Sequence, residues 1–508
     1  MKPTLQLFHL IKSLSKSEKR YFKLYSSIQS GDKIYMKLFD VIDKEKVYNE
    51  ESIKQKLKKD ISLKHFPSQK NHLYGQILKS LGMFHSESSV GSILKEQLRE
   101  IEILYNKALY KECNKVVSRA KKLAYDTERF HFIFEILNWE KQLSDDEQIL
   151  GTLEENLRMI NKEEEEVILK MRNLGDYHLL YSQINYVFRQ GGYTRNSKER
   201  EIVDRVSSDP LIIEPKMAIS ARSITMCFYI KGLCAVANNK LKEAVNHFLR
   251  ILELMDQNPL VAKDLRKRSI KTYNYLLLAY IELGQYDNVF KLISKMRSLD
   301  GYDSIYLKAK IFTATSNAEI VTYARMGEFK KGIEKLDFIL KGIEQFSGKI
   351  TKESEMLFYY NIAYLYFGLG NYHKALHWVN QLLNDNQVTG RLDICSFGRI
   401  LNLLIHSELQ NHDLLKHIIN STQRFQLKHQ RNYKFEMLIL SYFTKTMKVN
   451  SLKEKMSLFE KIKEELQEVV KDEYEKIALQ YIDFISWIKS KIERRSFEEV
   501  IREKAMLT

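Results

Sequence analysis

The fold is decided by residues 359–382, which read YYNIAYLYFGLGNYHKALHWVNQL. A helix-forming run ends near Gly370, and the aromatic Tyr372 follows two positions later. Glycine adopts the left-handed backbone conformation without a steric penalty, so it lets the chain turn sharply after a helix. The small side chain of Ala375 then allows a second helix to approach the first closely. These residues predict a helical hairpin.

The same Gly-x-aromatic turn occurs three times in register, and the key position three residues after the aromatic holds Val289, Gly332 and Ala375. Its turn glycines, Gly284, Gly327 and Gly370, are spaced 43 residues apart. An earlier and looser copy starts at Phe228 and turns near Asn239. A single hairpin leaves an apolar face uncovered, and a neighbouring hairpin can cover it. The repetition therefore predicts hairpins stacked into an α-solenoid.

The segments between residues 225 and 385 resemble tetratricopeptide repeats (TPRs), whose pattern is W-x2-L-G-x2-Y, then A-x3-F, then P. The chain departs from the family in its longer period and in the absence of the closing proline, since a TPR has ~34 residues. Helices lengthened by about two turns per repeat would explain both departures. HEAT and armadillo units have periods of ~40–47 residues, but the recurring Gly-x-aromatic turn favours the TPR interpretation.

Two breaks divide the chain into segments. A serine-rich linker ends at Ser92, and residues 191–216, which contain glycines and prolines, are either a hinge or an irregular connection. No proline follows Pro259, which suits uninterrupted helices. We expect an all-α fold, an α-solenoid of TPR-like hairpins with a small basic helical N-terminal unit and a helical C-terminal cap. The expected segments are a basic helical N-terminal domain (residues 1–85), degenerate TPR-like hairpins (residues 93–190), a TPR-like array (residues 217–420) and a C-terminal helical cap (residues 421–508).

Composition narrows the class of protein. The chain has 508 residues, of which 44% are hydrophobic and 29% charged, so it has the material for a core. Its four scattered cysteines are too few for a disulfide framework and favour reduced thiols. The N-terminal residues lack the features of a secretory signal, and no apolar window is long enough to span a membrane. We therefore expect a cytoplasmic protein.

The positive charge is concentrated at the N-terminus. The formal net charge is +16, and residues 1–85 hold 17 Lys and Arg against 8 Asp and Glu. Solvated helix faces explain such an excess, and so does an anionic partner such as nucleic acid. If this segment binds nucleic acid, the candidate contacts are its clustered lysines: Lys54, Lys56, Lys58, Lys59 and Lys70. The layout is similar to that of bacterial TPR regulators.

No catalytic motif stands out. The chain lacks the Walker A loop, the dinucleotide-binding glycine motif, the GxSxG elbow and the HExxH zinc motif. His373 and His377 are four residues apart, as zinc ligands on a helix can be, but no acidic residue or cysteine lies at a suitable spacing. We expect no metal site and no cofactor, and a protein that is not an enzyme.

The resemblance implies where a partner binds. The first helices of TPRs line a concave groove that holds extended or helical peptides, and the resemblance places seven candidate contacts in it: Tyr229, Lys271, Asn274, Asn317, Arg325, Tyr360 and Tyr364. Asparagines could bond a peptide backbone, and Arg325 could meet a carboxylate. The family's clamp for C-terminal carboxylates needs asparagine where this chain has Leu278, Val321 and Tyr364, so we do not expect a chaperone-tail adaptor.

Two functions follow from these observations. We expect a non-enzymatic TPR-type scaffold that binds a protein or peptide partner in its groove. The alternative is a peptide- or partner-sensing regulator whose basic N-terminal unit binds nucleic acid, with an affinity that falls steeply as salt rises.

Overall fold

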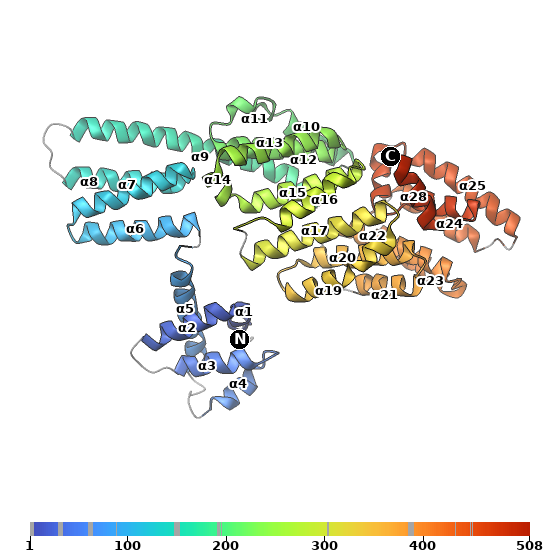
Figure 1. Cartoon of the computed structure of the whole chain (residues 1–508), viewed down its shortest axis with the longest axis horizontal. Helices are drawn as coiled ribbons and strands as arrows, with labels where there is room; N and C mark the ends of the chain where they lie inside the picture. Colours follow the sequence, from blue (N-terminus) through green and yellow to red (C-terminus); the bar gives the residue numbers. More distant parts are fainter. Residues whose placement is uncertain are drawn as a thin grey trace. The chain divides into compact units, whose positions relative to one another are not determined.

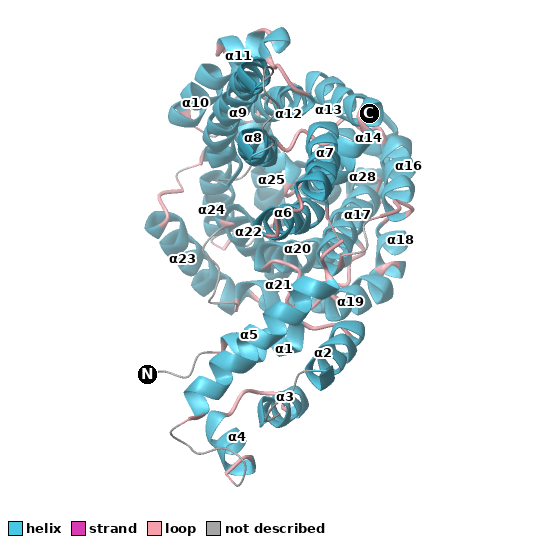
Figure 2. Ribbon diagram, turned by 90° about the vertical axis from the view of Figure 1, so that its left-hand side faces the viewer, coloured by secondary structure: helices cyan, strands magenta, loops and turns pink. Residues whose placement is uncertain are grey.

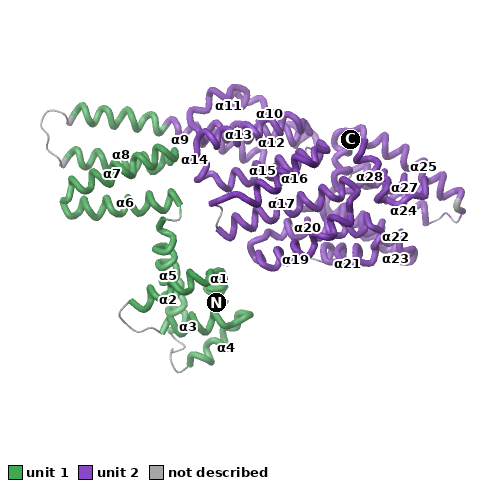
Figure 3. The backbone as a smooth tube through the Cα atoms, viewed as in Figure 1, with its two compact units in different colours: residues 1–168 green, residues 169–508 purple. Residues whose placement is uncertain are grey.

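The structure is a computed structural model that describes residues 5–28, 34–58, 65–87, 89–146, 153–189, 194, 196–301, 304–384, 391–431, 433–447, 449 and 451–507. All regular secondary structure in these ranges is helical (Figures 1 and 2). The all-α class expected from the sequence is confirmed. The chain divides into two compact units, residues 1–168 and 169–508 (Figure 3). The boundary lies within one long helix, a position that the sequence breaks did not mark.

Unit 1 begins with five helices: α1 (Gln6–Ser13), α2 (Lys16–Ile28), α3 (Ile34–Lys44), α4 (Glu50–Lys56) and α5 (Phe66–Phe84). Apolar residues at helical spacing form their common core, in which Leu38, Phe39 and Ile42 of α3 are fully buried. The ring of Phe22 lies 4.8 Å from that of Phe39. Asn49 starts α4 because its side chain accepts a hydrogen bond from the backbone N–H of Ser52.

The rest of unit 1 consists of antiparallel helices: α6 (Val90–Asn106), α7 (Tyr110–Asp126), α8 (Phe130–Asp146) and the first part of α9 (Leu153–Arg189). The turn between α6 and α7 contains Ala108 in the left-handed conformation. Cys113, Val117 and Ala120 are fully buried on one face of α7. This cysteine therefore acts as a small apolar filler of the helix interface.

Unit 2 begins with the last part of α9 and continues with α10 (Ser197–Ser207), α11 (Pro210–Ile213), the 3₁₀ helix η1 (Pro215–Met217) and the repeated hairpins. The hairpin helices are α12 (Ala221–Ala237) with α13 (Leu241–Gln257), α15 (Arg266–Glu282) with α16 (Tyr286–Arg297), α17 (Ile305–Arg325) with α18 (Phe329–Glu334) and α19 (Leu336–Gln345), α20 (Lys352–Gly368) with α21 (Tyr372–Leu383), and α22 (Leu392–Glu408) with α23 (His412–Lys428); the short α14 (Pro259–Asp264) follows the first of them.

The turns of these hairpins have the predicted geometry. Gly284, Gly327 and Gly370 adopt φ values of 70°, 69° and 78°. Asn239 and Gln410 adopt the same left-handed conformation at the corresponding turns of the first and last hairpins. First helices also pack on one another, since α15 contacts α17, α17 contacts α20, and α20 contacts α22. The hairpins therefore stack as a solenoid, as the repeat pattern predicted.

The C-terminal part is helical, with α24 (Lys434–Thr446), α25 (Leu452–Val469), α26 (Glu473–Lys476), the 3₁₀ helix η2 (Ile477–Gln480), α27 (Phe484–Glu493) and α28 (Phe497–Leu507). The sequence predicted a cap at the end of the array. In addition, α28 packs against α17, which lies in the middle of the array. We call residues 473–507 the return segment. None of the described helices combines the length and the apolar character that crossing a bilayer requires.

Candidate partner-binding site on the first helices of the repeats

The seven predicted partner contacts all lie on first helices of the hairpins. Tyr229 is on α12, Lys271 and Asn274 are on α15, Asn317 and Arg325 are on α17, and Tyr360 and Tyr364 are on α20. The structure separates them into two groups. The contacts on α17 and α20 bond to other parts of the chain, whereas Lys271 on α15 is exposed.

The return segment occupies the face of α17 and α20. Arg325 donates from Nη1 to the carbonyl oxygen of Leu479 at 3.3 Å and from Nη2 to that of Gln480 at 3.0 Å. The hydroxyl of Tyr360 donates to the carbonyl oxygen of Tyr481 at 2.7 Å. Two neighbouring first helices thus bind three consecutive backbone carbonyls.

Side chains of the return segment continue this contact. The ring of Phe497 lies 6.0 Å from Phe329, 6.2 Å from Tyr364 and 5.6 Å from Phe367, measured between centroids. The backbone N–H of Asp483 donates to the Tyr364 hydroxyl at 3.4 Å. Tyr364 is therefore held by the return segment at both its ring and its hydroxyl.

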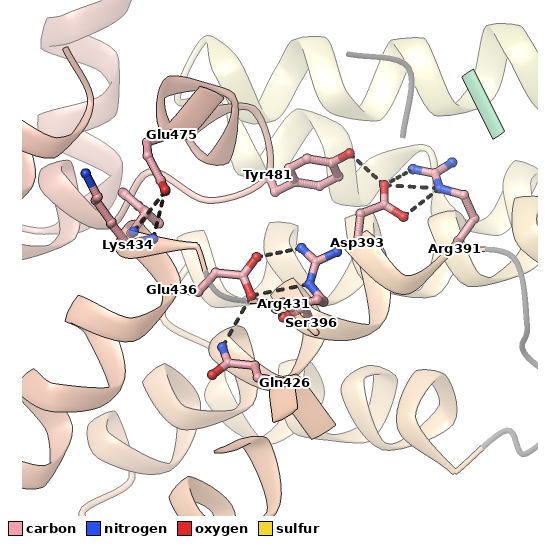
Figure 4. Close-up of polar contacts among 10 residues, drawn as sticks. Arg391, Asp393, Ser396, Gln426, Arg431, Lys434, Glu436, Glu475 and Tyr481 are labelled. Atoms are coloured by element: carbon pink, nitrogen blue, oxygen red, sulfur yellow. Dashed lines mark hydrogen bonds and ion pairs between the residues drawn. The ribbon is translucent and has the colours of Figure 1, made fainter. Parts of the chain in front are cut away.

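Buried polar contacts fix the start of the return segment to α22 and α24 (Figure 4). The Glu475 carboxylate accepts hydrogen bonds from the backbone N–H groups of Lys434 and Phe435, at 2.8 and 3.0 Å. These are first-turn donors of α24, so Glu475 caps that helix. The Tyr481 hydroxyl donates to Asp393 at 2.6 Å. Each contact joins residues far apart in the sequence.

The apolar burial of the return segment predicts that it is a permanent part of unit 2. Seven large apolar side chains of the segment are at most 8% exposed: Ile477, Ile482, Phe484, Trp487, Ile488, Phe497 and Ile501. Burying each contributes about 1.5–3 kcal/mol, so together they contribute more than about 10 kcal/mol. A partner of micromolar affinity supplies only about 8 kcal/mol. A peptide would not displace the segment at that affinity.

Asn317 is also engaged inside the chain. It is 7% exposed, its Nδ2 donates to the carbonyl oxygen of Thr313 at 3.2 Å, and its Oδ1 accepts from Asn361 at 3.1 Å. Arg325 has a further partner, because Nη2 lies 2.9 Å from the Glu282 carboxylate. In this structure Asn317 and Arg325 therefore have intramolecular partners in place of the peptide that the sequence predicted.

The face of α15 is different, because Lys271 is exposed there and Asn274 is half-buried. The Lys271 Nζ lies 3.4 Å from the Tyr181 hydroxyl, which α9 contributes. Tyr229 is only 3% exposed and lies between the rings of Tyr181 and Tyr275, at 5.9 and 6.1 Å. Tyr229 thus supports an aromatic wall behind Lys271.

Arg268 is a residue of this site that the sequence analysis missed. It lies one turn before Lys271 on α15, and its Nη1 donates to the carbonyl oxygen of Arg222 at 3.4 Å and to the Thr225 hydroxyl at 3.2 Å. Among the described residues no carboxylate pairs with it. Asp264, the acidic residue four positions earlier, pairs with Arg222.

The surroundings of Arg268 keep it a charged group in a poorly solvated place. Burial, with the nearby positive charge of Arg222, lowers the pKa of Arg268 to about 10. The guanidinium therefore remains protonated at neutral pH. Burial and the charge of Arg268 also lower the pKa of His178. Charged side chains that leave water are normally paired, so an unpaired one is unusual.

A cavity of about 480 Å³ lies where the α15 face meets the return segment. The turn between α12 and α13 contributes Lys240 and Lys242, and the return segment contributes Lys476; all three are exposed. The carboxylates of Glu243 and Glu282 also line it. Basic side chains thus lie near both ends of α15, and carboxylates accompany those at the far end.

The lysines predicted to bind nucleic acid are in unit 1, where three of them form ion pairs. Lys54 and Lys70 lie 2.8 and 2.7 Å from Glu50, and Lys56 pairs with Glu45. Burial alone would raise the pKa of Glu50, but hydrogen bonds from Lys54, Lys70 and Tyr48 outweigh it and lower the pKa to about 2. Lys58 is exposed, and Lys59 lies outside the described residues. Nucleic-acid binding here stays a prediction.

The histidines four residues apart lie on a second helix of the array. His373 and His377 are both exposed on α21. Within the part of the chain that the structure describes, no three His, Cys, Asp or Glu side chains are grouped as metal ligands would be.

Comparisons with known proteins give a distant likeness to solved structures. No protein-family model matches the sequence, and no curated protein matches it. Among solved structures, the crystal structure of NprR in complex with its cognate peptide NprX is similar to this chain, with 15% sequence identity and a TM-score of 0.40. The match covers 73% of this chain and 97% of that chain. The likeness is too distant to assign a family or a function.

Proposed function

We propose that the chain is a non-enzymatic helical-repeat protein that binds an acidic protein or peptide along α9, α12 and α15. A carboxylate of the partner lies between Arg268 and Lys271. The observation that carries this proposal is the Arg268 guanidinium, which is partly buried and has no carboxylate partner among the described residues.

A carboxylate would complete the coordination of Arg268. Its hydrogen bonds to described residues go to two neutral oxygen atoms and start from Nη1, so Nε and Nη2 remain as a donor pair. Arginine binds carboxylates through such a pair with two parallel hydrogen bonds. Lys271 is exposed one turn away on the same face and adds a second positive charge. The site therefore favours Asp, Glu or a chain terminus.

The aromatic wall strengthens this interaction. The ring of Tyr229 lies 5.9 Å from that of Tyr181 and 6.1 Å from that of Tyr275, so the floor of the site is aromatic. Charge-assisted hydrogen bonds are stronger where the local dielectric constant is low. Tyrosine and arginine are also the side chains that most often dominate binding energy at protein interfaces.

The return segment limits where the partner can lie. It covers α17 and α20 through Arg325, Tyr360 and Tyr364. A partner is therefore confined to the α9, α12 and α15 part of the array, ending at the cavity beside Glu282. The three lysines around that cavity would meet further acidic residues of the partner.

The test is selection of peptides from a random display library on the immobilised full chain, followed by affinity measurements by fluorescence anisotropy. We expect the selected peptides to share an Asp, a Glu or a free C-terminus. Arg268→Gln should weaken them about 10- to 100-fold, because a hydrogen-bonded charge contributes about 1.5–3 kcal/mol. Arg250→Gln removes a charge from the exposed face of α13 and should leave the affinity unchanged.

Two results would refute the proposal: selected peptides without any shared acidic group, or equal affinity for the wild type and Arg268→Gln. Circular dichroism and a thermal melt of each variant would establish that the substitutions leave the fold intact.

A further inference from the structure

The hairpin of α22 and α23 has an unusual interface between its two helices. The residues at 11, 8 and 4 positions before the turn residue of each hairpin face its second helix. In α15 these residues are Tyr273, Leu276 and Tyr280, and in α20 they are Tyr359, Ile362 and Tyr366. Both sets are aromatic or aliphatic. In α22, counted from Gln410, the same positions hold Arg399, Asn402 and His406. The α22 set is polar throughout, whereas the α12 and α17 sets mix polar and apolar residues: Phe228, Lys231 and Ala235, then Ser316, Glu319 and Tyr323.

A cavity lies beside the polar set of α22. In the α20 hairpin the ring of Tyr359 lies 5.7 Å from that of Trp378 on the second helix, so aromatic side chains fill the interface. In the α22 hairpin a cavity of about 380 Å³ occupies this place. It is lined by Arg399, Asn402 and His406 from α22 and by Leu414, His417, Ile418 and Ser421 from α23. Leu414, His417 and Ser421 are exposed, so the cavity is open to solvent on the α23 side.

Arg399 is held rigidly, yet part of its guanidinium has no partner. The guanidinium stacks on Phe425 at 4.7 Å from the ring centroid. Its one hydrogen bond to a described residue runs from Nη1 to the Ser421 hydroxyl at 3.3 Å. The buried Nε has no hydrogen-bond partner among the described residues, and neither does the buried Oδ1 of Asn402. A donor and an acceptor of the cavity wall are thus both unsatisfied.

Two buried carboxylates near this hairpin, Asp393 and Glu436, already have partners (Figure 4). Asp393 pairs with Arg391 at 2.7 Å and accepts from Tyr481 at 2.6 Å. Glu436, which is fully buried, pairs with Arg431 at 2.6 Å and accepts from Ser396 at 2.6 Å. Neither carboxylate pairs with Arg399.

The α17 hairpin shows what the chain does with a buried charge at the same interface. Glu319, at the position equivalent to Asn402, is 7% exposed. Arg297 reaches it at 2.6 Å and Lys335 at 3.9 Å. The chain therefore supplies opposite charges to Glu319, whereas no described carboxylate meets Arg399.

We propose that the cavity between α22 and α23 binds a small organic hydroxycarboxylate. Its carboxylate lies on the Nε–Nη2 edge of Arg399, and its hydroxyl donates to Asn402 Oδ1. This site is separate from the partner site on α15 and does not depend on it. Arginine stacked on an aromatic ring presents this edge for bidentate binding of a carboxylate.

The charge of the lining favours a monoanion over phosphate. Arg399 is the one permanently charged residue of the lining. Burial lowers the pKa of His406, so its imidazole is neutral at neutral pH. Its Nδ1 lies 3.1 Å from the Asn411 amide nitrogen, which donates to it and leaves Nε2–H as a further donor. A single carboxylate balances this lining, whereas a phosphate dianion would leave a negative charge uncompensated.

The test uses thermal melts and calorimetric titration of the full chain with lactate, acetate and inorganic phosphate, each against sodium chloride at equal ionic strength. We expect lactate to raise the melting temperature saturably. Acetate should bind more weakly because it lacks the hydroxyl donor, and phosphate should match the chloride control. Equal or stronger binding of phosphate would overturn the assignment to a carboxylate, and so would the absence of a saturable effect of lactate.

Variants distinguish the cavity from other sites. Arg399→Gln should abolish the lactate effect, whereas Arg424→Gln, an equal charge change at an exposed position of α23, should retain it. The combined variant Arg399→Tyr, Asn402→Leu and His406→Tyr carries the side chains of α15 into α22. Without ligand, this variant should melt at a higher temperature than the wild type, and lactate should not change its melting temperature. Retained binding in Arg399→Gln, or a lower melting temperature of the combined variant, would overturn the proposal.

Discussion

Truncation of Phe497 tests whether the return segment is a permanent part of unit 2. This side chain is 8% exposed and lies against Phe329, Tyr364 and Phe367. Replacing a buried phenylalanine by alanine loses its transfer free energy and leaves a cavity, which together cost about 3–5 kcal/mol. Because three aromatic rings surround it and cannot all close the space, we expect Phe497→Ala to cost about 4 kcal/mol.

The assay is urea unfolding followed by the fluorescence of Trp487, which is 3% exposed in the return segment. The other tryptophans, Trp139 and Trp378, are replaced by phenylalanine so that the signal reports the segment alone. Met506→Ala is the matched control, since Met506 is on the same helix but 79% exposed, and it should change stability by less than about 0.5 kcal/mol. A cost below about 1 kcal/mol for Phe497→Ala would mean that the segment is only loosely attached.

Three further predictions concern single residues. Gly327 and Gly348 both have φ near 70°, but a Cβ added to Gly327 would lie 2.7 Å from the backbone of Arg502, whereas a Cβ added to Gly348 would have no atom within 4 Å. Gly327→Ala should therefore lower the melting temperature more than Gly348→Ala. Equal effects of the two substitutions would contradict the packing of α28. Glu436→Ala leaves its buried arginine unpaired and should cost about 3–5 kcal/mol in urea unfolding; a loss below about 1 kcal/mol would show that the pair is dispensable. Because the pKa of Glu50 is lowered in the folded protein, its contribution to stability is complete above the unfolded pKa of about 4.3 and is lost as the pH falls towards 2. Acid titration followed by circular dichroism should therefore show a smaller loss of stability in Glu50→Gln than in the wild type. Identical acid titration profiles of the two proteins would contradict the ion pairing of Glu50.

The fold could be predicted because its signals are local. A Gly-x-aromatic turn recurs in register at Gly284, Gly327 and Gly370, and a small residue follows the last two of these turns. The turns at Asn239 and Gln410 have the same left-handed conformation but lack glycine, so these positions match the repeat pattern less closely. The boundary between the units lies within a continuous helix and has no signal in composition.

The candidate site was only partly predictable, because its occupancy depends on contacts between distant residues. The pattern placed Arg325 and Tyr360 on first helices, and they are there. Nothing within their repeats indicates that residues 479–481 lie against them, since that contact joins positions more than a hundred residues apart. Arg268 escaped notice for a similar reason: its helix position is ordinary, and only the tertiary surroundings show that it has no carboxylate partner among the described residues.

Part of the charge pairing could have been recognised in the sequence. Glu50 and Lys54 are four residues apart on one helix, a spacing that forms ion pairs. The pair of Glu50 with Lys70 joins two helices, so the sequence pattern does not show it. The basic excess of the N-terminal segment therefore overstates the charge that these lysines offer to a partner.

The most direct test of the central claim compares the affinity of one selected acidic peptide for three full-length proteins: the wild type, Arg268→Gln and Tyr360→Phe. Tyr360→Phe keeps the ring but removes its hydrogen bond to the return segment. If the partner lies on α9, α12 and α15, Arg268→Gln loses about 10- to 100-fold in affinity and Tyr360→Phe binds as the wild type does. Weakened binding by Tyr360→Phe together with unchanged binding by Arg268→Gln would place the partner on α17 and α20 and contradict the account.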